Sequence, residues 1–302
     1  MAKRSGKTVV VVAGPTAVGK TTVAVSLAKH FHTEIISADS RQCFKELNIG
    51  VARPSIEELE LVPHHFIASH SIHEPVTAAS FEKYALEKAE ELFQKYDTII
   101  MVGGTGMYIK AFCEGLDNIP EVDIVIRENI IRNYEAKGLE WLQKEIQEKD
   151  SEFYNKGEIQ NPQRMMRALE VMEGTGQSIL SFRSGEKKQR DFNIIKVGLE
   201  LPKEQLQQHI NNRVDAMINS GLVEEVKSLL PHRNLNALQT VGYAELFDYF
   251  DNKLSLDEAI ERIRINTRQY AKRQMTWFKK DKEIRWFESS NTKAIIDFIN
   301  VG

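Results

Sequence analysis

Cysteine is scarce in this chain, and long apolar runs are missing. The 302 residues include only two cysteines, Cys43 and Cys113, which are far apart and form no Cys-x-x-Cys pair. A disulfide framework and a zinc site are therefore not expected. No run approaches the roughly 18 apolar residues of a membrane span. The apolar stretch at residues 9–13 is too short for a signal-peptide core. These absences predict a globular protein without a membrane partner, in a reducing, cytoplasmic location.

An excess of charge of one sign is also missing over the whole chain. Forty Lys and Arg stand against 43 Asp and Glu, a net charge of −3, which by itself indicates no nucleic-acid partner. Residues 261–282 differ, because they hold eight Lys or Arg and only two acids. Such a run is usually a solvated helix face, and binding of RNA or another phosphate ligand is the rarer alternative. Charge alone leaves both interpretations open.

Short apolar, β-branched runs alternate with helical patterns. Helices are predicted to begin near Lys20 and to cover residues 80–96, and strands are predicted at 7–13, 34–38, 98–102, 193–200 and, as a short one, 283–287. Strands that alternate with helices predict an α/β fold with a parallel sheet flanked by helices. After Pro202 the pattern is almost wholly helical and ends in a long helix over about 255–280.

The pattern changes between residues 115 and 162. This stretch is charged and amphipathic, with helical segments at 122–137 and 139–149 and no strand-like run. We predict a small all-helical insertion domain at 119–160. The P-loop NTPase-like α/β core is then formed by 1–118 and 161–302.

The sequence GPTAVGKT fits the phosphate-binding pattern GxxxxGK[ST]. Its members are Gly14, Pro15, Thr16, Ala17, Val18, Gly19, Lys20 and Thr21. The glycines allow close backbone approach, exposed N–H groups face phosphate oxygens, Lys20 adds positive charge, and the Thr21 hydroxyl is a ligand for Mg²⁺. The predicted strand before the loop and helix after it are the context the motif needs. Taken alone, the loop suggests a nucleotide such as ATP, but kinases, ATPases and other transferases share it.

The second predicted strand ends in SADSRQ, which places Asp39 at the carboxyl end of a strand. Ligands of open α/β sheets bind at that edge, so Asp39 is a candidate general base or metal-linked acid. The alternative, that Asp39 caps a turn or the next helix, is equally open. The third strand ends in GGTG at 103–106, where a Walker-B strand would end in an acid, and no NKxD guanine signature occurs. A GTPase is therefore not expected.

Two further features carry basic or ligating side chains. Arg164 and Arg167 lie three residues apart in QRMMRALEV, on one face of a predicted helix, where they either bind phosphate or merely solubilise the surface. The pair His64 and His65 has no third ligand at suitable spacing, so we interpret it as structural.

Together these segments resemble the bacterial tRNA dimethylallyltransferase family, the tRNA isopentenyltransferases. The correspondence runs in order through GPTAVGKT (14–21), SADSRQ (37–42), VPHHF (62–66), VGGTGMY (102–108), QRMMRALEV (163–171), TVGYAEL (240–246) and TRQYAKRQMTWF (267–278). A P-loop alone occurs in many families. Unrelated P-loop proteins have no reason to carry the later segments in this order.

The resemblance implies transfer of a dimethylallyl group from dimethylallyl diphosphate to N6 of the adenosine 3′ of the tRNA anticodon, position 37. The loop would then hold the leaving diphosphate, with Lys20 and Mg²⁺ on Thr21 stabilising its charge. Asp39 would take the proton of the adenine amine, and Thr105 would hydrogen-bond that amine. Arg167 would lie near the diphosphate or the RNA backbone.

The resemblance also implies a tRNA-binding surface and a monomer that acts on the anticodon stem-loop. Unpaired loop bases leave their stack most readily, and the basic helix at 261–282 would meet phosphate of the anticodon arm. The implied RNA contacts are Asp39, Ser40, Arg41, Gln42, Thr105, Arg127, Gln163, Arg164, Met165, Met166, Arg167, Gln239, Thr240, Val241, Gly242, Tyr243 and Ala244.

Two other functions remain as alternatives. The first is an ATP-dependent small-molecule kinase, since the loop alone does not exclude it; the missing Walker-B acid and GGTGMY argue against it. The second is a non-catalytic RNA-binding protein that retains the loop as a relic.

Overall fold

The computed structural model describes residues 6–301, which form two compact units. An α/β unit contains the residues up to Glu114 and those from Gln189 onward, and a helical unit contains Gly115–Lys188. Residues 1–5, which include the basic start of the chain, and residue 302 lie outside the described residues. The boundaries at 119 and 160 drawn from the sequence stay a prediction about domain organisation.

A six-stranded parallel sheet forms the centre of the α/β unit, in the order β3-β2-β4-β1-β5-β6. Its strands are β1 (Thr8–Ala13), β2 (Ile35–Ser37), β3 (His64–His65), β4 (Thr98–Gly103), β5 (Asn193–Glu200) and β6 (Arg285–Glu288). The predicted α/β fold with a parallel sheet is confirmed. Only β3, with two residues, was not predicted, because so short a strand leaves no periodic pattern.

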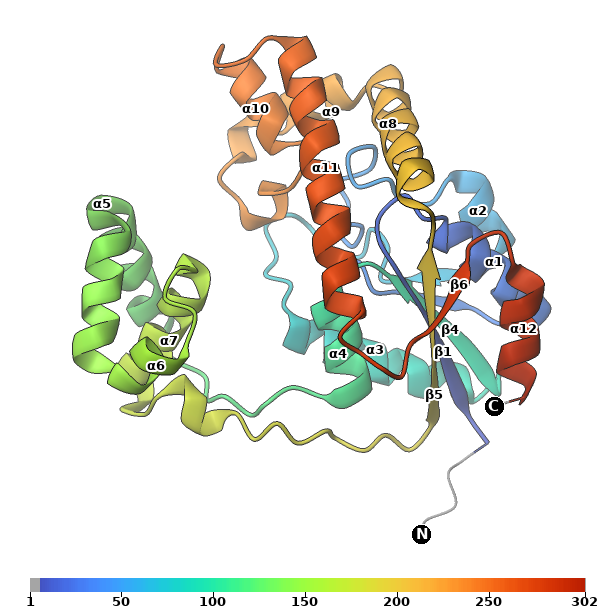
Figure 1. Ribbon diagram of the computed structural model, residues 1–302, viewed down its shortest axis with the longest axis horizontal. Coiled ribbons are helices and arrows are strands. Elements are labelled where there is room, and N and C mark those ends of the chain that lie inside the picture. The colour runs from blue at the N-terminus through green and yellow to red at the C-terminus, as the bar shows by residue number, and fades with distance from the viewer. Residues whose placement is uncertain (1–5, 302) are drawn as a thin grey trace. The chain divides into compact units, whose positions relative to one another are not determined.

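Helices cover both faces of this sheet (Figure 1). The helices of the α/β unit are α1 (Lys20–His30), α2 (Ile56–Leu61), α3 (Ala78–Phe93), α4 (Gly106–Glu114), α8 (Lys203–Asn219), α9 (Leu222–Ser228), α10 (Ala244–Phe250), α11 (Leu256–Phe278) and α12 (Thr292–Val301), with 3₁₀ turns η2 (Leu230–His232) and η3 (Asn236–Leu238). In β1, Val9 and Val11 join one buried cluster, whereas Val10 and Val12 join another. A strand buried on both faces is apolar throughout, which explains the continuous valine run.

The helical unit consists of α5 (Ile124–Lys149), α6 (Ser151–Lys156), α7 (Pro162–Thr175) and η1 (Ile179–Phe182). Gly138 interrupts α5 with a φ of 75°, so the two helical segments predicted from the sequence meet at a break. Leu142, Ile146 and Leu169 belong to a buried core of this unit's own. None of the helices in residues 6–301 has both the length and the apolar character that crossing a membrane requires.

The register of the sheet brings three loops to one edge. Ala13 at the end of β1 is paired with Gly103 at the end of β4, and Ser37 at the end of β2 is paired with Val102. All strands are parallel, so their carboxyl ends meet at the same edge. The phosphate loop, the segment that begins at Asp39 and the GGTG turn are therefore neighbours.

Candidate functional site

The phosphate loop has the backbone geometry that its glycines allow. Gly14 has a φ of 151° and Gly19 a φ of 96°, and a Cβ on Gly14 would lie 2.7 Å from the carbonyl oxygen of Leu199. Any other residue would be strained at both positions. Lys20 begins α1, and its Nζ donates a hydrogen bond to the carbonyl of Pro15 at 2.8 Å. The lysine is thus folded back over the loop.

A cavity of about 1120 Å³ opens on this loop. Its lining includes Thr16, Ala17, Gly19, Lys20 and Thr21, but not Gly14, Pro15 or Val18. The side chain of Val18 is fully buried in the core, so only its backbone is available to a ligand. The loop residues predicted to bind phosphate therefore divide into five that line the cavity and three that shape the loop.

Lys20, Arg213 and Asp39 are among the charged side chains that line this cavity, which also include Arg41, Arg53, Arg273, Glu58 and Glu245. Burial, and after it the nearby charge of Arg213, lower the pKa of Lys20 to about 8, against the opposing effect of Asp39. Burial likewise lowers the pKa of Arg213, against the pull of Asp39. Neither cation forms an ion pair with a carboxylate among residues 6–301. Arg213, on α8, was not predicted from the sequence, because no motif marks which arginine of a helix faces the loop.

Asp39 has one oxygen engaged by the backbone. Its Oδ1 accepts hydrogen bonds from the N–H groups of Arg41 at 2.9 Å and Gln42 at 3.2 Å. In the described part of the chain no group donates to its Oδ2. Asp39 therefore does cap a turn, as one of the two interpretations of the sequence held. Its carboxylate also lines the cavity and keeps one oxygen free.

Thr105 joins the GGTG turn to the segment that carries Asp39. Its N–H donates to the carbonyl of Ala38 at 3.2 Å, and its hydroxyl accepts from the N–H of Ser40 at 3.0 Å. The hydroxyl also approaches Ser40 Oγ at 3.3 Å. Gly103 lines the cavity, whereas Thr105 does not. Thr105 thus lies next to Asp39, with its hydroxyl already bonded inside the protein.

The turn before α10 forms another wall of the cavity. The residues predicted to bind tRNA that line it are Asp39, Ser40, Arg41, Gln42, Gln239, Thr240, Val241, Gly242 and Ala244. The guanidinium of Arg41 reaches across to the carbonyl of Asn236 at 2.8 Å. This contact holds the SADSRQ segment against the turn.

Tyr243, also predicted to bind tRNA, lies inside the protein. Its side chain is 0% exposed, and its hydroxyl donates to Glu225 at 2.6 Å. The same carboxylate accepts the N–H groups of Ile49 and Gly50 at 2.8 and 3.0 Å. A side-chain contact of Tyr243 with RNA is therefore not available in this structure, and the residue supports the turn from within.

The remaining predicted residues belong to the helical unit. Arg167 pairs with Glu170 at 2.6 Å, and Arg127 lies 3.8 Å from the same carboxylate. Glu170 is buried, with 5% of its surface exposed. Arg164 pairs with Glu158, and Gln163 is exposed. Met165 and Met166 are buried in the unit's core, so their predicted contacts with RNA would have to use the backbone.

The loop offers oxygen ligands for a divalent cation. Thr21, Ser37 and Asp39 line the same cavity, and hydroxyl and carboxylate oxygens are ligands that Mg²⁺ accepts. These side chains fit the Mg²⁺ predicted on Thr21.

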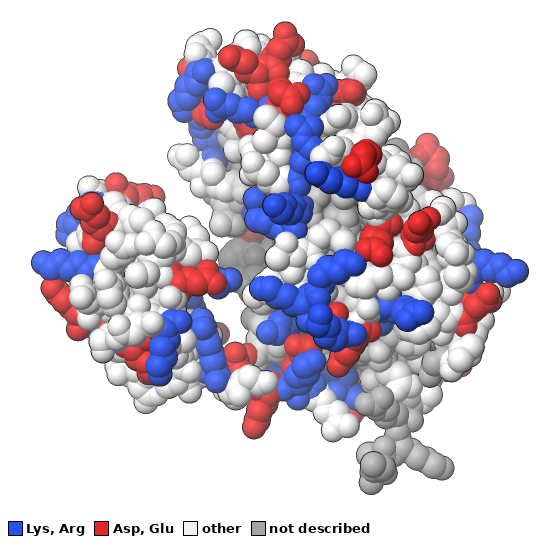
Figure 2. Space-filling view, viewed as in Figure 1, with Lys and Arg blue, Asp and Glu red and all other residues white. Residues whose placement is uncertain are grey.

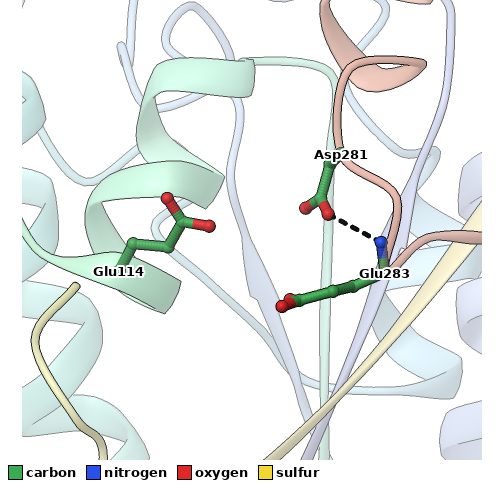
Figure 3. Close-up of side chains that lie close together, drawn as sticks. All are labelled: Glu114, Asp281 and Glu283. Atoms are coloured by element: carbon green, nitrogen blue, oxygen red, sulfur yellow. Dashed lines mark hydrogen bonds between the residues drawn. The ribbon is translucent and has the colours of Figure 1, made fainter. Parts of the chain in front are cut away.

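A second group of acids, Glu114, Asp281 and Glu283, lies elsewhere in the α/β unit (Figure 3). The Nζ of Lys196 lies 2.7 Å from Asp281, 2.8 Å from Glu283 and 3.7 Å from Glu114. Burial alone would lower the pKa of Lys196, but its bonds to Asp281 and Glu283 raise it. This cluster therefore already holds its own cation.

The basic segment at 261–282 forms most of α11, and part of its charge is neutralised. Arg264 pairs with Asp215, Arg268 with Glu261 and Lys279 with Glu200. Lys272 is exposed and forms no ion pair with the residues described. Figure 2 shows Lys and Arg gathered on the visible face of the α/β unit around the end of this helix. The net positive charge there is smaller than the sequence count indicates.

Known proteins match the chain over nearly all of its length. Residues 42–281 match the family model described as IPP transferase. The tRNA dimethylallyltransferase of Christiangramia forsetii is 50% identical, with 95% of each chain covered. That of Flavobacterium johnsoniae is 46% identical, with 97% of each covered.

Solved structures agree with these matches. The tRNA isopentenylpyrophosphate transferase of Bacillus halodurans has a TM-score of 0.72 at 32% identity, covering 97% of this chain and 96% of that one. A eukaryotic dimethylallyltransferase acting on tRNA has a TM-score of 0.76 at 26% identity, covering 94% of this chain and 74% of the other. The family resemblance of the motifs is thereby confirmed, and the chain belongs to the IPP transferase family.

Proposed function

We propose that this chain is a tRNA dimethylallyltransferase, which alkylates N6 of the adenosine 3′ of the anticodon with dimethylallyl diphosphate as donor. One observation carries the proposal: Lys20, Arg213 and Asp39 meet on one cavity, with the phosphate loop on one wall and the turn at 239–242 on another. Two cations without carboxylate partners suit a diphosphate, and the turn-held carboxylate suits an amine that must lose a proton.

The donor side of the cavity stabilises the leaving group. When the bond between C1 of the dimethylallyl group and the diphosphate breaks, its electron pair stays on the diphosphate oxygen. Lys20, Arg213 and the loop N–H groups then meet a growing negative charge, and such contacts accelerate the reaction because they strengthen in the transition state. Mg²⁺ held by the Thr21 hydroxyl would add a further positive charge at the diphosphate when bound.

The acceptor side holds the amine. The nitrogen N6 forms the new bond to C1 and gives its proton to Asp39, whose Oδ2 is the free oxygen. Thr105 follows Gly104 in the GGTG turn, and its hydroxyl accepts a hydrogen bond from the N–H of Ser40, next to Asp39. Thr105 therefore orders the segment that carries Asp39. The target adenine must leave the anticodon-loop stack to reach this cavity, and unstacking costs least free energy in a single-stranded loop.

The helical unit and α11 would bind the rest of the anticodon arm. Arg127, Arg164 and Arg167 offer guanidinium groups, and Lys272 offers an exposed ammonium group. Phosphate contacts of this kind give affinity without reading the sequence. A monomer in the cytoplasm accords with this role and stays a prediction.

A transfer assay separates this function from a kinase. The protein is incubated with an anticodon stem-loop, Mg²⁺ and either dimethylallyl diphosphate or ATP, and the RNA is analysed by mass spectrometry. We expect one C5 unit on the RNA with dimethylallyl diphosphate and no change with ATP. Turnover of ATP without any C5 gain would support the kinase, and tight RNA binding without either reaction would support the non-catalytic alternative.

A further inference from the structure

Gln274 on α11 inserts its side-chain amide between the phosphate loop and the GGTG turn. Its Nε2 donates to the carbonyl of Gly104 at 2.9 Å, and its Oε1 accepts the N–H of Thr16 at 2.8 Å. The residue is 7% exposed, and its two partners lie 170 and 258 positions away in the sequence. One buried side chain therefore joins the loop on the donor side to the turn on the acceptor side.

The glycines of the turn leave space for this amide that a Cβ would occupy. A Cβ on Gly104 would lie 2.3 Å from Gln274 Nε2, and a Cβ on Gly106 would lie 2.2 Å from the indole of Trp277. Both glycines thus allow α11 to approach the end of β4 closely. The Gly104 position also lies near Lys20, whose Nζ would be 3.6 Å from the same Cβ.

The contact needs the chemistry of an amide. Glutamine carries a donor and an acceptor on one planar group, so it bonds a carbonyl and an N–H at the same time. A carboxylate could accept from Thr16 but could not donate to Gly104, and an aliphatic side chain would leave both buried groups unpaired. The Thr16 N–H is at the beginning of the loop, so this bond fixes where the loop starts.

We propose that Gln274 is a positioning residue that fixes the phosphate loop relative to the Gly103–Thr105 turn. In that role Gln274 sets the distance between two reacting atoms. One is C1 of dimethylallyl diphosphate, which the loop holds by the diphosphate, and the other is N6 of the adenosine beside Asp39. The inference rests on the proposed function, because it concerns how the two halves of the cavity are aligned for transfer. A misplacement of about 1 Å between reacting groups can cost roughly 100-fold in rate.

The first test is steady-state transfer by Gln274→Ala. We expect kcat/KM for the stem-loop to fall about 100-fold, mainly through kcat, because alignment is lost while Lys20, Arg213 and Asp39 remain in the cavity, whose lining also includes Gln274. Gln94→Ala, an exposed glutamine at the end of α3, is the matched control and should keep wild-type kinetics. A Gln274→Ala protein with wild-type kcat and KM would overturn the inference.

The second test uses Gly104→Ala, which leaves Gln274 in place but pushes its amide away. Both single variants disturb the same contact, so we expect Gly104→Ala to lose about as much activity as Gln274→Ala. The double variant should then be no slower than the slower single, because removal of the amide also removes the collision. If the fold losses in activity of the two single variants multiplied in the double variant, residues 104 and 274 would act independently, which would contradict the inference.

Failure of this inference is distinguishable from failure of the proposed function. A wild-type protein that transfers no C5 unit counts against the function itself. Transfer by the wild type together with unaffected Gln274→Ala and Gly104→Ala variants counts against the positioning role alone. Circular dichroism and diphosphate binding establish that each variant is folded, and Gly104→Ala, which keeps the buried glutamine, tests the contact even if Gln274→Ala does not fold.

Discussion

The two units of this chain treat their cations differently. In the α/β unit, Lys20 and Arg213 line a cavity without a carboxylate partner, and burial lowers the pKa of both. In the helical unit, Arg127 and Arg167 share the buried carboxylate of Glu170. A buried cation without a partner is unfavourable until an anion arrives, whereas a paired arginine is already compensated. From this difference we propose that a small anion binds at the unpaired cations, and not wherever arginines are most frequent.

Removal of the carboxylate opposite the unpaired cations should have the strongest effect. Asp39→Asn keeps an oxygen that can accept from Arg41 and Gln42 but loses the base, so we expect the single-turnover transfer rate to fall about 10³-fold. Diphosphate binding should be retained, since both cations remain. Asp39→Ala, which also loses the turn contact, is the comparison variant. An asparagine variant that transfers at close to the wild-type rate would exclude Asp39 as the base.

Removal of one cation from each unit compares them directly. Arg213→Gln should raise KM for dimethylallyl diphosphate by about 10- to 100-fold, because the diphosphate loses a charge-assisted contact in the cavity. Arg167→Gln should leave this KM nearly unchanged and weaken stem-loop binding by less than about tenfold. The measurement is initial rate against donor concentration at saturating RNA. Equal effects of the two substitutions on donor KM would mean that Arg167 also reaches the diphosphate.

The pH dependence of donor binding should reflect Lys20. Its pKa in the protein without ligand is lowered to about 8, so the amine is charged below that pH and loses its proton as the pH rises through it. Donor affinity should therefore be constant below pH 8 and fall above it, by at most about tenfold per pH unit. Lys20→Arg stays protonated and should flatten the profile. An identical decline in Lys20→Arg would assign the titration to another group.

The basic helix should give the smallest effect. Lys272 has no carboxylate partner among the described residues, whereas Arg268 is paired with Glu261. For stem-loop binding, Lys272→Ala should reduce the slope of log affinity against log salt by about 1, and Arg268→Ala should reduce it less. Fluorescence anisotropy at several salt concentrations measures both. A slope unchanged in Lys272→Ala would assign α11 a purely structural role.

Much of the fold followed from the sequence because its signals are local. The valine run of β1, the glycines of the loop and the interruption at Gly138 each determine backbone conformation within a few residues. The position of Asp39 at the sheet edge was predictable for a similar reason, since parallel strands align their carboxyl ends.

The rest of the site depends on contacts between segments far apart in sequence. Arg213 faces the loop because of how α8 packs, and Gln274 bonds to Thr16 across 258 positions. The burial of Tyr243 and its bond to Glu225 likewise depend on tertiary packing. A sequence motif does not say whether each of its side chains points toward a ligand or into the core.

The decisive measurement is the stoichiometry of products from the wild-type protein with dimethylallyl diphosphate, Mg²⁺ and an anticodon stem-loop. Diphosphate and alkylated RNA are counted in the same reaction, with ATP present as a competitor. We expect one diphosphate released for each C5 unit gained at the adenosine, with ATP unconsumed. Consumption of ATP without alkylated RNA would show that the cavity serves a nucleotide and not an isoprenoid donor.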